Sequence, residues 1–384
     1  MSCPRLPALL VYMLCISSVF CSVALMFYTY FLIQPQRVRN PSLLPQIGCT
    51  PDKYQEANHE GQQEISNINP IPLIDFKDLG SKKEKVMLLI IVSTAPQRMD
   101  RRQAIRDTWW KHCDGSMVKC VFVTDGFIAN HAQRSSAIQE RNIYKDMELQ
   151  PLQGGREFGF HFLNQIKWAM ATFHFRYLLR IDDDYFLCLK RLLAELPMRP
   201  NKNLVWGSFH CQRKGKMTWI DEAFMIFTRD IIQTFLAQNE SSMLCHPHAD
   251  QQIGLWLNKI TRKMFFHDKR LYHHPPASFS PKFQNITNVC DSYLGVHGTY
   301  VDKTRYFGRN VNDSAKKSHS IPKFYSFCPT TKFDYRFMNR RFRFEPKLCK
   351  DNPTWNVERT MFIGRERQYA LRTSGHTREV TNGR

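Results

Sequence analysis

The chain of 384 residues has few acidic side chains for its size and shows no internal repetition. Its 34 Asp and Glu stand against 54 Lys and Arg, which gives a formal net charge of +20. No period of roughly 20 to 50 residues recurs, so solenoid and propeller folds are excluded. Cysteine pairs with zinc-finger spacing and basic heptad patterns are also absent, which argues against the common metal-finger and zipper-type nucleic-acid binders. An apolar content of 43% excludes a fully disordered chain.

The basic excess has three readings, namely binding to nucleic acid, to an anionic surface, or to an anionic substrate such as a nucleotide. Composition alone does not choose among them. The excess is heavy after Thr299, with clusters at 316–317 and 340–343. We interpret this part of the chain as a solvated basic face.

The first forty residues predict a membrane anchor. Residues 6–33 contain no charged side chain, and a helix needs about 20 apolar residues to cross a bilayer. A cleaved signal peptide is the alternative, with residues 22–24 as the cleavage site, but the apolar run continues past them. We therefore predict a stub at 1–5, a transmembrane signal anchor at 6–33 and a proline-rich stem at 34–85.

Cysteines and glycosylation motifs predict the side of the membrane on which the body lies. Nine of the twelve cysteines follow the anchor and are scattered along the chain, which predicts a few disulfides plus at least one free thiol. Cys113 and Cys120 are the best local pair. Asn-x-Ser/Thr motifs occur at Asn239, Asn285 and Asn312. Together these features favour a lumenal or extracellular body with a short cytosolic stub.

The body alternates strand and helix patterns. Apolar runs predict strands at 86–92, 118–124 and 175–181, the first of them buried on both faces. Helical patterns occur at 98–110, 132–139 and 160–173. We therefore predict an α/β fold with an open, mainly parallel sheet, in which ligands bind at the carboxyl ends of the strands.

Three carboxylates, Asp182, Asp183 and Asp184, directly follow the third apolar run. Their mutual repulsion raises their pKa values unless a cation relieves it. A divalent ion with oxygen ligands would do so and would also bind a diphosphate. The alternative is an acidic turn that caps the next helix. The apolar strand before the turn and the basic chain around it favour the metal site.

Two motifs carry a resemblance to a known family. Residues 101–109 read RRQAIRDTW and residues 177–184 read YLLRIDDD. Both resemble motifs of the β-1,3-galactosyltransferase family, which also includes N-acetylglucosaminyl and Fringe-type transferases. Weaker echoes lie at 140–147 and 290–297, so the likeness covers roughly residues 86–300. The resemblance implies a GT-A fold, a single-pass type II Golgi membrane protein with a lumenal catalytic domain, and a UDP-sugar donor with Mn²⁺.

The resemblance also implies roles for individual residues. Asp182 and Asp183 would face the ribose and the sugar of the donor, and Asp184 and His297 would bind the metal. For His297 an ordinary core or surface histidine is the alternative. Two arginines, Arg98 and Arg102, are candidates for contact with the nucleotide or diphosphate. For Arg106 we favour ion pairs behind the site.

An inverting transferase needs a carboxylate that takes the proton of the acceptor hydroxyl. The family's Glu-Asp-Val-x-x-Gly pattern matches residues 249–254, which implies that Asp250 is the base, although Ala249 replaces the first acid. A second departure is the stretch 217–227, which lacks the family's glycines and carries Asp221 and Glu222. These two acids are candidates for contact with the acceptor, and plain surface charges are the alternative.

We therefore predict a catalytic domain at 86–350 with a basic polar tail at 351–384. The expected enzyme moves a hexose or N-acetylhexosamine, with galactose favoured, from a UDP-sugar to a hydroxyl, O3 favoured, of a glycan on glycoprotein or glycolipid. A catalytically silent lumenal sugar-binding protein is one alternative. A glycoside hydrolase that uses Asp221, Glu222 and Asp250 is another. No nucleic-acid partner is expected, and the donor sugar, the acceptor and a homo-oligomeric state stay open.

Overall fold

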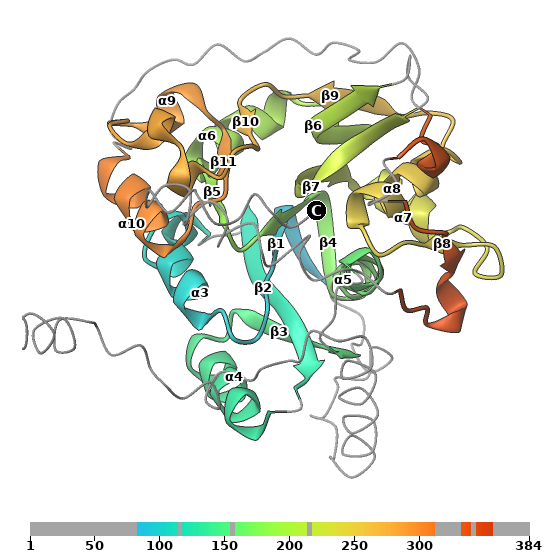
Figure 1. Ribbon diagram of the computed structural model, residues 1–384, viewed down its shortest axis with the longest axis horizontal. Coiled ribbons are helices and arrows are strands. Elements are labelled where there is room, and N and C mark those ends of the chain that lie inside the picture. The colour runs from blue at the N-terminus through green and yellow to red at the C-terminus, as the bar shows by residue number, and fades with distance from the viewer. Residues whose placement is uncertain are drawn as a thin grey trace, which may run out of the picture. The chain divides into compact units, whose positions relative to one another are not determined.

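A mixed, mostly parallel β-sheet forms the centre of the computed structural model, which describes residues 83–113, 117–128, 130–153, 158–212, 217–311, 332–338 and 343–355 (Figure 1). The strand order is β3-β2-β1-β4-β7-β6-β9. The bounds are β1 (Glu84–Ser93), β2 (Val118–Phe127), β3 (Met147–Gln153), β4 (Phe173–Asp182), β6 (Leu204–Gln212), β7 (Met217–Thr228) and β9 (Met264–His267). Strand β7 runs antiparallel to both of its neighbours, β4 and β6, and the other pairings are parallel. The predicted α/β class is confirmed in this form.

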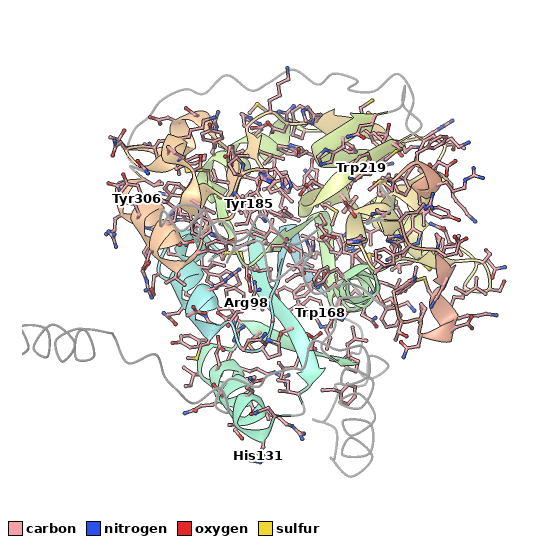
Figure 2. All side chains as sticks on the ribbon, viewed as in Figure 1. Arg98, His131, Trp168, Tyr185, Trp219 and Tyr306 are labelled. Atoms are coloured by element: carbon pink, nitrogen blue, oxygen red, sulfur yellow. A yellow bond between two sulfur atoms is a disulfide. The ribbon has the colours of Figure 1, made fainter. Side chains whose placement is uncertain are left out.

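The continuous apolar run of β1 is explained by burial on both faces. Successive side chains of a strand point to opposite faces, so Leu88, Ile90 and Val92 pack in one core while Leu89 and Ile91 pack in the other. Helices α3 (Met99–Arg106), α4 (His131–Tyr144), α6 (Leu189–Glu195) and α10 (Val301–Asn310) cover the first core. Helices α5 (Phe158–Thr172), α7 (Arg229–Leu236) and α8 (Ala249–Leu257) cover the second. Figure 2 shows the side chains that fill both layers, with Trp168 of α5 and Arg98 before α3 labelled.

Two small sheets bring distant segments to the central one. In the first, β11 (Gly295–His297) lies between β10 (Leu271–Tyr272) and β5 (Tyr185–Leu187), and His297 is paired with Tyr185. In the second, β8 (Leu244–Cys245) pairs with β12 (Lys347–Leu348). A short helix, α9 (Val289–Ser292), precedes β11. The first small sheet matters most for function, because it carries His297 to the end of β4.

Disulfides join Cys113 to Cys120, Cys188 to Cys290 and Cys245 to Cys349. The predicted local pair is therefore confirmed. The other two bridges span 102 and 104 residues of sequence, which no spacing argument could have paired. Cys211 is also disulfide-bonded.

Several predictions concern segments at the chain's edges. Among the residues that the structure describes, no helix combines the length and the apolarity that a membrane span requires. The predicted stub, the anchor at 6–33, nearly all of the stem and Asn312 lie outside the described residues. Two of the three glycosylation motifs can be placed, and both Asn239 and Asn285 are exposed.

Candidate active site

The three predicted aspartates form the turn between β4 and β5, at the carboxyl end of a central strand. Asp183 is buried and points into the protein. Its carboxylate accepts hydrogen bonds from Thr94 Oγ1 at 2.7 Å, Arg98 Nη1 at 3.0 Å and Arg101 Nη1 at 2.9 Å. Arg101 also lies 3.6 Å from Asp184. Asp183 thus anchors the turn to the segment that follows β1, whereas Asp182 and Asp184 are partly exposed.

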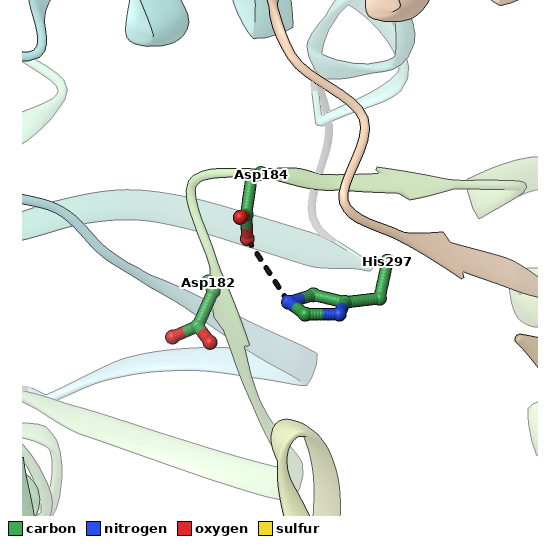
Figure 3. Close-up of side chains that lie close together, drawn as sticks. All are labelled: Asp182, Asp184 and His297. Atoms are coloured by element: carbon green, nitrogen blue, oxygen red, sulfur yellow. Dashed lines mark ion pairs between the residues drawn. The ribbon is translucent and has the colours of Figure 1, made fainter. Parts of the chain in front are cut away.

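Asp184 and His297 come together as the resemblance implied, and Asp182, which was expected to face the donor, lies beside them (Figure 3). Their ligand atoms all lie within 4.8 Å of one another, and Asp184 Oδ1 is 3.4 Å from His297 Nε2. All three side chains are partly exposed. Two carboxylates and an imidazole form a donor set that divalent first-row metals accept.

A neighbouring backbone group orients His297 for such a role. Its Nδ1 lies 3.0 Å from the carbonyl oxygen of His273, and because a carbonyl only accepts, Nδ1 is the nitrogen that carries the proton. Nε2 is therefore the nitrogen presented to Asp184. The ring also stacks on His273, with centroids 5.0 Å apart. A backbone carbonyl that fixes the tautomer is a common support for a metal-ligating histidine, so these residues fit a divalent cation.

The charges at this turn are strongly coupled. Burial raises the pKa of Asp182 to about 7, with help from the charges of Asp184 and Glu222 and against the pull of Arg180. Burial would also raise the pKa of Asp184, but His297, Arg101 and Arg98 hold it well below its usual range. Burial would lower the pKa of His297, yet the neighbouring carboxylates, Asp184 first, raise it to about 10. The carboxylates of the turn thus favour a positive charge at the position of His297.

A second acidic cluster lies next to the first. Glu222, on β7, His248 and Asp250, at the start of α8, have ligand atoms within 4.8 Å of one another. The buried Arg180 joins the two clusters, since its Nη2 lies 2.8 Å from Asp182 Oδ1 and its Nη1 donates to the carbonyl oxygen of Glu222. Residues 180 and 182 share one face of β4, which explains how a single strand serves both clusters.

The second cluster has the opposite electrostatic character from Asp184. Burial raises the pKa of Asp250 well above its ordinary value, and the charges of Glu222 and Asp221 add to the effect. Burial likewise raises the pKa of Glu222. A carboxyl group with a raised pKa is a stronger proton acceptor once ionised.

Asp221 lies beside both clusters and is almost fully buried. Its Oδ2 is 3.1 Å from His273 Nε2 and 3.4 Å from His210 Nε2, and its Oδ1 accepts the backbone N–H of Ala223. Burial would raise the pKa of Asp221, but these histidines hold it well below the usual range. The ring of His210 stacks on Trp219, with centroids 4.8 Å apart. Asp221 is thus part of a built network, unlike a plain surface charge.

The predicted arginines separate into two kinds. Arg98 is one-third exposed, and its guanidinium sits beside the aspartate turn. Arg102 is fully buried and donates to Glu140, to Thr94 and to the carbonyl oxygens of Ala95 and Pro96. This position argues against the expected nucleotide contact, because none of the Arg102 side chain reaches the surface.

Arg106 makes the ion pairs expected of it. Its guanidinium bonds Glu140 at 2.8 Å and Asp146 at 2.8 Å. Glu140 therefore receives both Arg102 and Arg106, and this buried trio supports the segment that carries Arg98 and Arg101.

Gly254, which matched the family's glycine, has a packing role. A Cβ at this position would lie 2.6 Å from the ring of Phe333. The side chain of Asn258 on the same side of α8 donates to the Phe333 carbonyl and accepts its N–H. The glycine thus lets residues 332–338 pack against the helix that carries Asp250.

Sequence reasoning missed several members of the site: Arg101, Arg180, Glu222 as a partner of Asp250, His248 and His273. One signal was available for Arg180, a charged residue between the apolar Leu179 and Ile181 and two positions before Asp182. The histidines carried no such signal, because their neighbours come from segments far away in sequence.

Comparison with known proteins agrees with this geometry. Residues 100–218 match the family model described as Galactosyltransferase. The lactosylceramide 1,3-N-acetyl-beta-D-glucosaminyltransferases of Mus musculus and Rattus norvegicus are 31% identical over 156 residues and 28% identical over 123 residues. Human beta-1,3-galactosyltransferase 4 is 30% identical over 134 residues. These matches cover 38%, 29% and 32% of this chain, and they span only 41%, 32% and 34% of the relatives' lengths.

Solved structures give a weaker likeness. The galactosyltransferase LgtC in complex with donor and acceptor sugar analogs matches with a TM-score of 0.38 and 10% identity, covering 60% of this chain and 98% of that one. A score of this size does not establish a shared fold, so the likeness to the family rests on the sequence matches. Residues 100–218 are similar to the galactosyltransferase family, and the chain spans less than half the length of the curated relatives it matches.

Proposed function

We propose that this protein is an inverting β-1,3-glycosyltransferase that moves a hexose or N-acetylhexosamine from a UDP-sugar to a hydroxyl of an acceptor glycan. One observation carries the proposal. A cation-binding triad, Asp182, Asp184 and His297, and a separate carboxylate with a raised pKa, Asp250, flank the same buried arginine, Arg180. The match of residues 100–218 to the galactosyltransferase family model supports the same interpretation.

The triad is proposed to hold a divalent cation, with Mn²⁺ favoured, which when bound would offset the negative charge of the departing diphosphate. His297 presents Nε2 to that position, and the His273 carbonyl keeps it there. Arg98 donates to Asp183 and has a side chain that is 34% exposed, and it is proposed to contact a phosphate oxygen of the donor. Asp183 keeps Arg98 and Arg101 oriented.

Asp250 is proposed to accept the proton of the acceptor hydroxyl, O3 favoured. As that proton leaves, the oxygen attacks C1 of the donor sugar, and the bond from C1 to the UDP oxygen breaks. Attack from the face opposite UDP inverts the anomeric centre. His210, which is about one-third exposed, stacks on the buried Trp219 and lies beside Asp221, and we propose that it contacts the acceptor sugar.

We further propose that the body acts in the Golgi lumen behind the predicted signal anchor. The disulfides are consistent with an oxidising compartment. The proposal leaves the donor sugar and the acceptor open, and a screen of UDP-sugars tests the donor.

The test is a donor screen of the purified lumenal body with UDP-galactose, UDP-N-acetylglucosamine, UDP-N-acetylgalactosamine and UDP-glucose, with and without Mn²⁺. Transfer from one of these donors, with inversion at C1 and loss of activity in D250N, is the expected result. Thermal protection by UDP only when Mn²⁺ is present would support the triad. Neither transfer nor such protection would leave the silent binding protein as the better reading. Glycan hydrolysis without UDP would favour a hydrolase.

A further inference from the structure

The first turn of α8 is held by a side chain from another element. Glu222 Oε2 on β7 accepts the backbone N–H of Ala249, the first residue of α8, at 2.9 Å. The backbone N–H of Asp250 also donates to this carboxylate. Residue 248, at the N-cap position, makes no side-chain capping bond. The N–H groups that open a helix need partners from outside it, and Glu222 supplies them here.

We propose that Glu222 is a positioning residue for Asp250, which caps α8 from β7 and fixes the place from which Asp250 reaches the acceptor. The inference rests on the proposed function, since it gives Asp250 the role of base. Glu222 lies where β7 shifts its register against β6, and there Arg180 donates to the Glu222 carbonyl. Ala249, which opens the helix, has no side chain that could do this work.

Charge adds a second effect to the positional one. The groups that face Asp250 are Glu222 and Asp221 from β7, Arg180 from β4 and His248 from the segment before α8. Of these, Glu222 is a carboxylate whose ligand atom lies within 4.8 Å of that of Asp250. Its negative charge disfavours ionisation of Asp250. Removing that charge should make Asp250 ionise at a lower pH and accept protons less strongly.

The same three side chains, Glu222, His248 and Asp250, could be read as a second metal site. The hydrogen bonds argue against it, because the Glu222 carboxylate already receives two backbone N–H groups from α8. Replacing Glu222 by Gln removes the charge and keeps an oxygen that accepts hydrogen bonds. A capping role should survive this change, whereas a role as metal ligand should not.

Two variants separate these effects. E222Q keeps an oxygen that can accept the Ala249 N–H but loses the charge, and E222A loses both. D230N is the matched control, since Asp230 Oδ2 accepts the backbone N–H of Asn203 at 2.8 Å near the start of another helix. Each variant is compared with the wild type by hydrogen exchange of the peptide that contains residues 249–250 and by the pH dependence of kcat/KM.

In E222A we expect faster exchange at 249–250 and a kcat about 10- to 100-fold lower, since a misplacement of about 1 Å can cost ~100-fold in rate, with donor KM nearly unchanged. In E222Q we expect exchange close to that of the wild type and an acid limb of the pH profile displaced by about one unit to lower pH. D230N should match the wild type in both measurements.

Wild-type exchange at 249–250 and wild-type kcat in E222A would overturn the inference. An unmoved acid limb in E222Q would overturn its electrostatic half, and loss of bound metal in E222Q would favour the metal reading instead. The exchange measurement needs no activity. A wild type that transfers no sugar would therefore defeat the proposed function, while the exchange data would still decide whether Glu222 caps α8.

Discussion

Asp184 and Asp250 are two enclosed aspartates of one site, and their environments drive their pKa values in opposite directions. Burial raises both values at first. At Asp184 the charges of His297, Arg101 and Arg98 reverse the effect and keep the carboxyl ionised. At Asp250 the charges of Glu222 and Asp221 reinforce the effect of burial, and the backbone N–H of Gln251 and the charge of Arg180 oppose it.

The difference shows how one residue type can serve two tasks. A carboxylate surrounded by cationic groups stays negative and suits a ligand for a metal, whereas one surrounded by other carboxylates favours the proton and suits a base. Since Arg180 touches both clusters, the two tasks are kept apart by the placement of the other charges. Substitutions in the cluster of Asp184 and in the cluster of Asp250 should therefore have different effects.

The largest effect is expected when Asp250 loses its ability to take a proton. D250N should lower kcat by about 10²- to 10⁴-fold, the usual contribution of a general base. UDP affinity should stay close to that of the wild type, because the triad that is proposed to bind it is intact. Steady-state kinetics and calorimetry with UDP and Mn²⁺ check both parts, and wild-type kcat in D250N would remove the base assignment.

The next largest effect is expected when Asp184 is removed from the proposed cation-binding triad. D184A should weaken Mn²⁺-dependent UDP binding by at least about 10- to 100-fold, the range found even for residues that merely orient metal ligands. The exposed Asp302 on α10 provides a control, D302A, which should bind UDP normally. Calorimetric titration with and without Mn²⁺ measures the effect. Equal UDP affinity in D184A and the wild type under both conditions would refute the metal role.

Substitution of Glu140, which bonds Arg102 and Arg106 behind Arg101, should lower the free energy of unfolding. E140Q leaves the buried Arg102 and Arg106 without their shared carboxylate, and breaking a buried pair costs about 3–5 kcal/mol of unfolding free energy. Chemical denaturation measures this loss. The matched variant E84Q removes one partner of an exposed pair with Lys119 and should change the unfolding free energy by no more than about 1 kcal/mol.

E140Q should also change how stability depends on pH. Burial would raise the pKa of Glu140, but the hydrogen bonds and charges of Arg102 and Arg106 lower it in the folded state. A lowered folded pKa gives stability that is full above the unfolded pKa and is lost as the pH falls through the folded pKa. The acid decline of the wild type should therefore be shallower in E140Q, and equal slopes would contradict the assignment.

The smallest effect is expected at Arg98. Arg98 and Arg101 both bond Asp183 Oδ1, but the side chain of Arg98 is 34% exposed and that of Arg101 only 9%. R98Q should lower the unfolding free energy by about 0.2–1 kcal/mol, as for an exposed pair, and R101Q by more. Thermal unfolding of the two variants gives the comparison, and an equal loss would show that burial does not separate the two arginines.

Hydrophobic patterns in the sequence predicted most of the strands and helices of the first half of the central sheet. The apolar runs of β1, β2 and β4 and the three helices between the first strands lie where the sequence places them, since burial on two faces leaves an unmistakable apolar run. Strands β3 and β6 escaped notice. The first carries Glu148, Gln150 and Gln153, and the second is interrupted by Gly207 and His210, so neither shows a clean apolar period.

The sequence predicted those site residues that belong to a recognisable motif. The aspartate turn and His297 were named and lie together, because the family resemblance supplied a long-range relation that spacing alone could not. What sequence could not give is the direction in which each side chain points. Arg102 stands between Arg101 and Gln103 like any motif residue, and only packing against Glu140 reveals that it is buried.

Cys245, which lies just before the helix that carries Asp250, forms a disulfide with Cys349. The two cysteines are 104 residues apart in sequence. At a synthesis rate of about 5–20 residues per second, the partner of Cys245 leaves the ribosome roughly 5 to 20 s after Cys245 itself. Throughout that interval β8 has no β12 to pair with. A premature stop codon before residue 349 would therefore remove the bridge that ties β8, the strand just before the helix of Asp250, to residue 349.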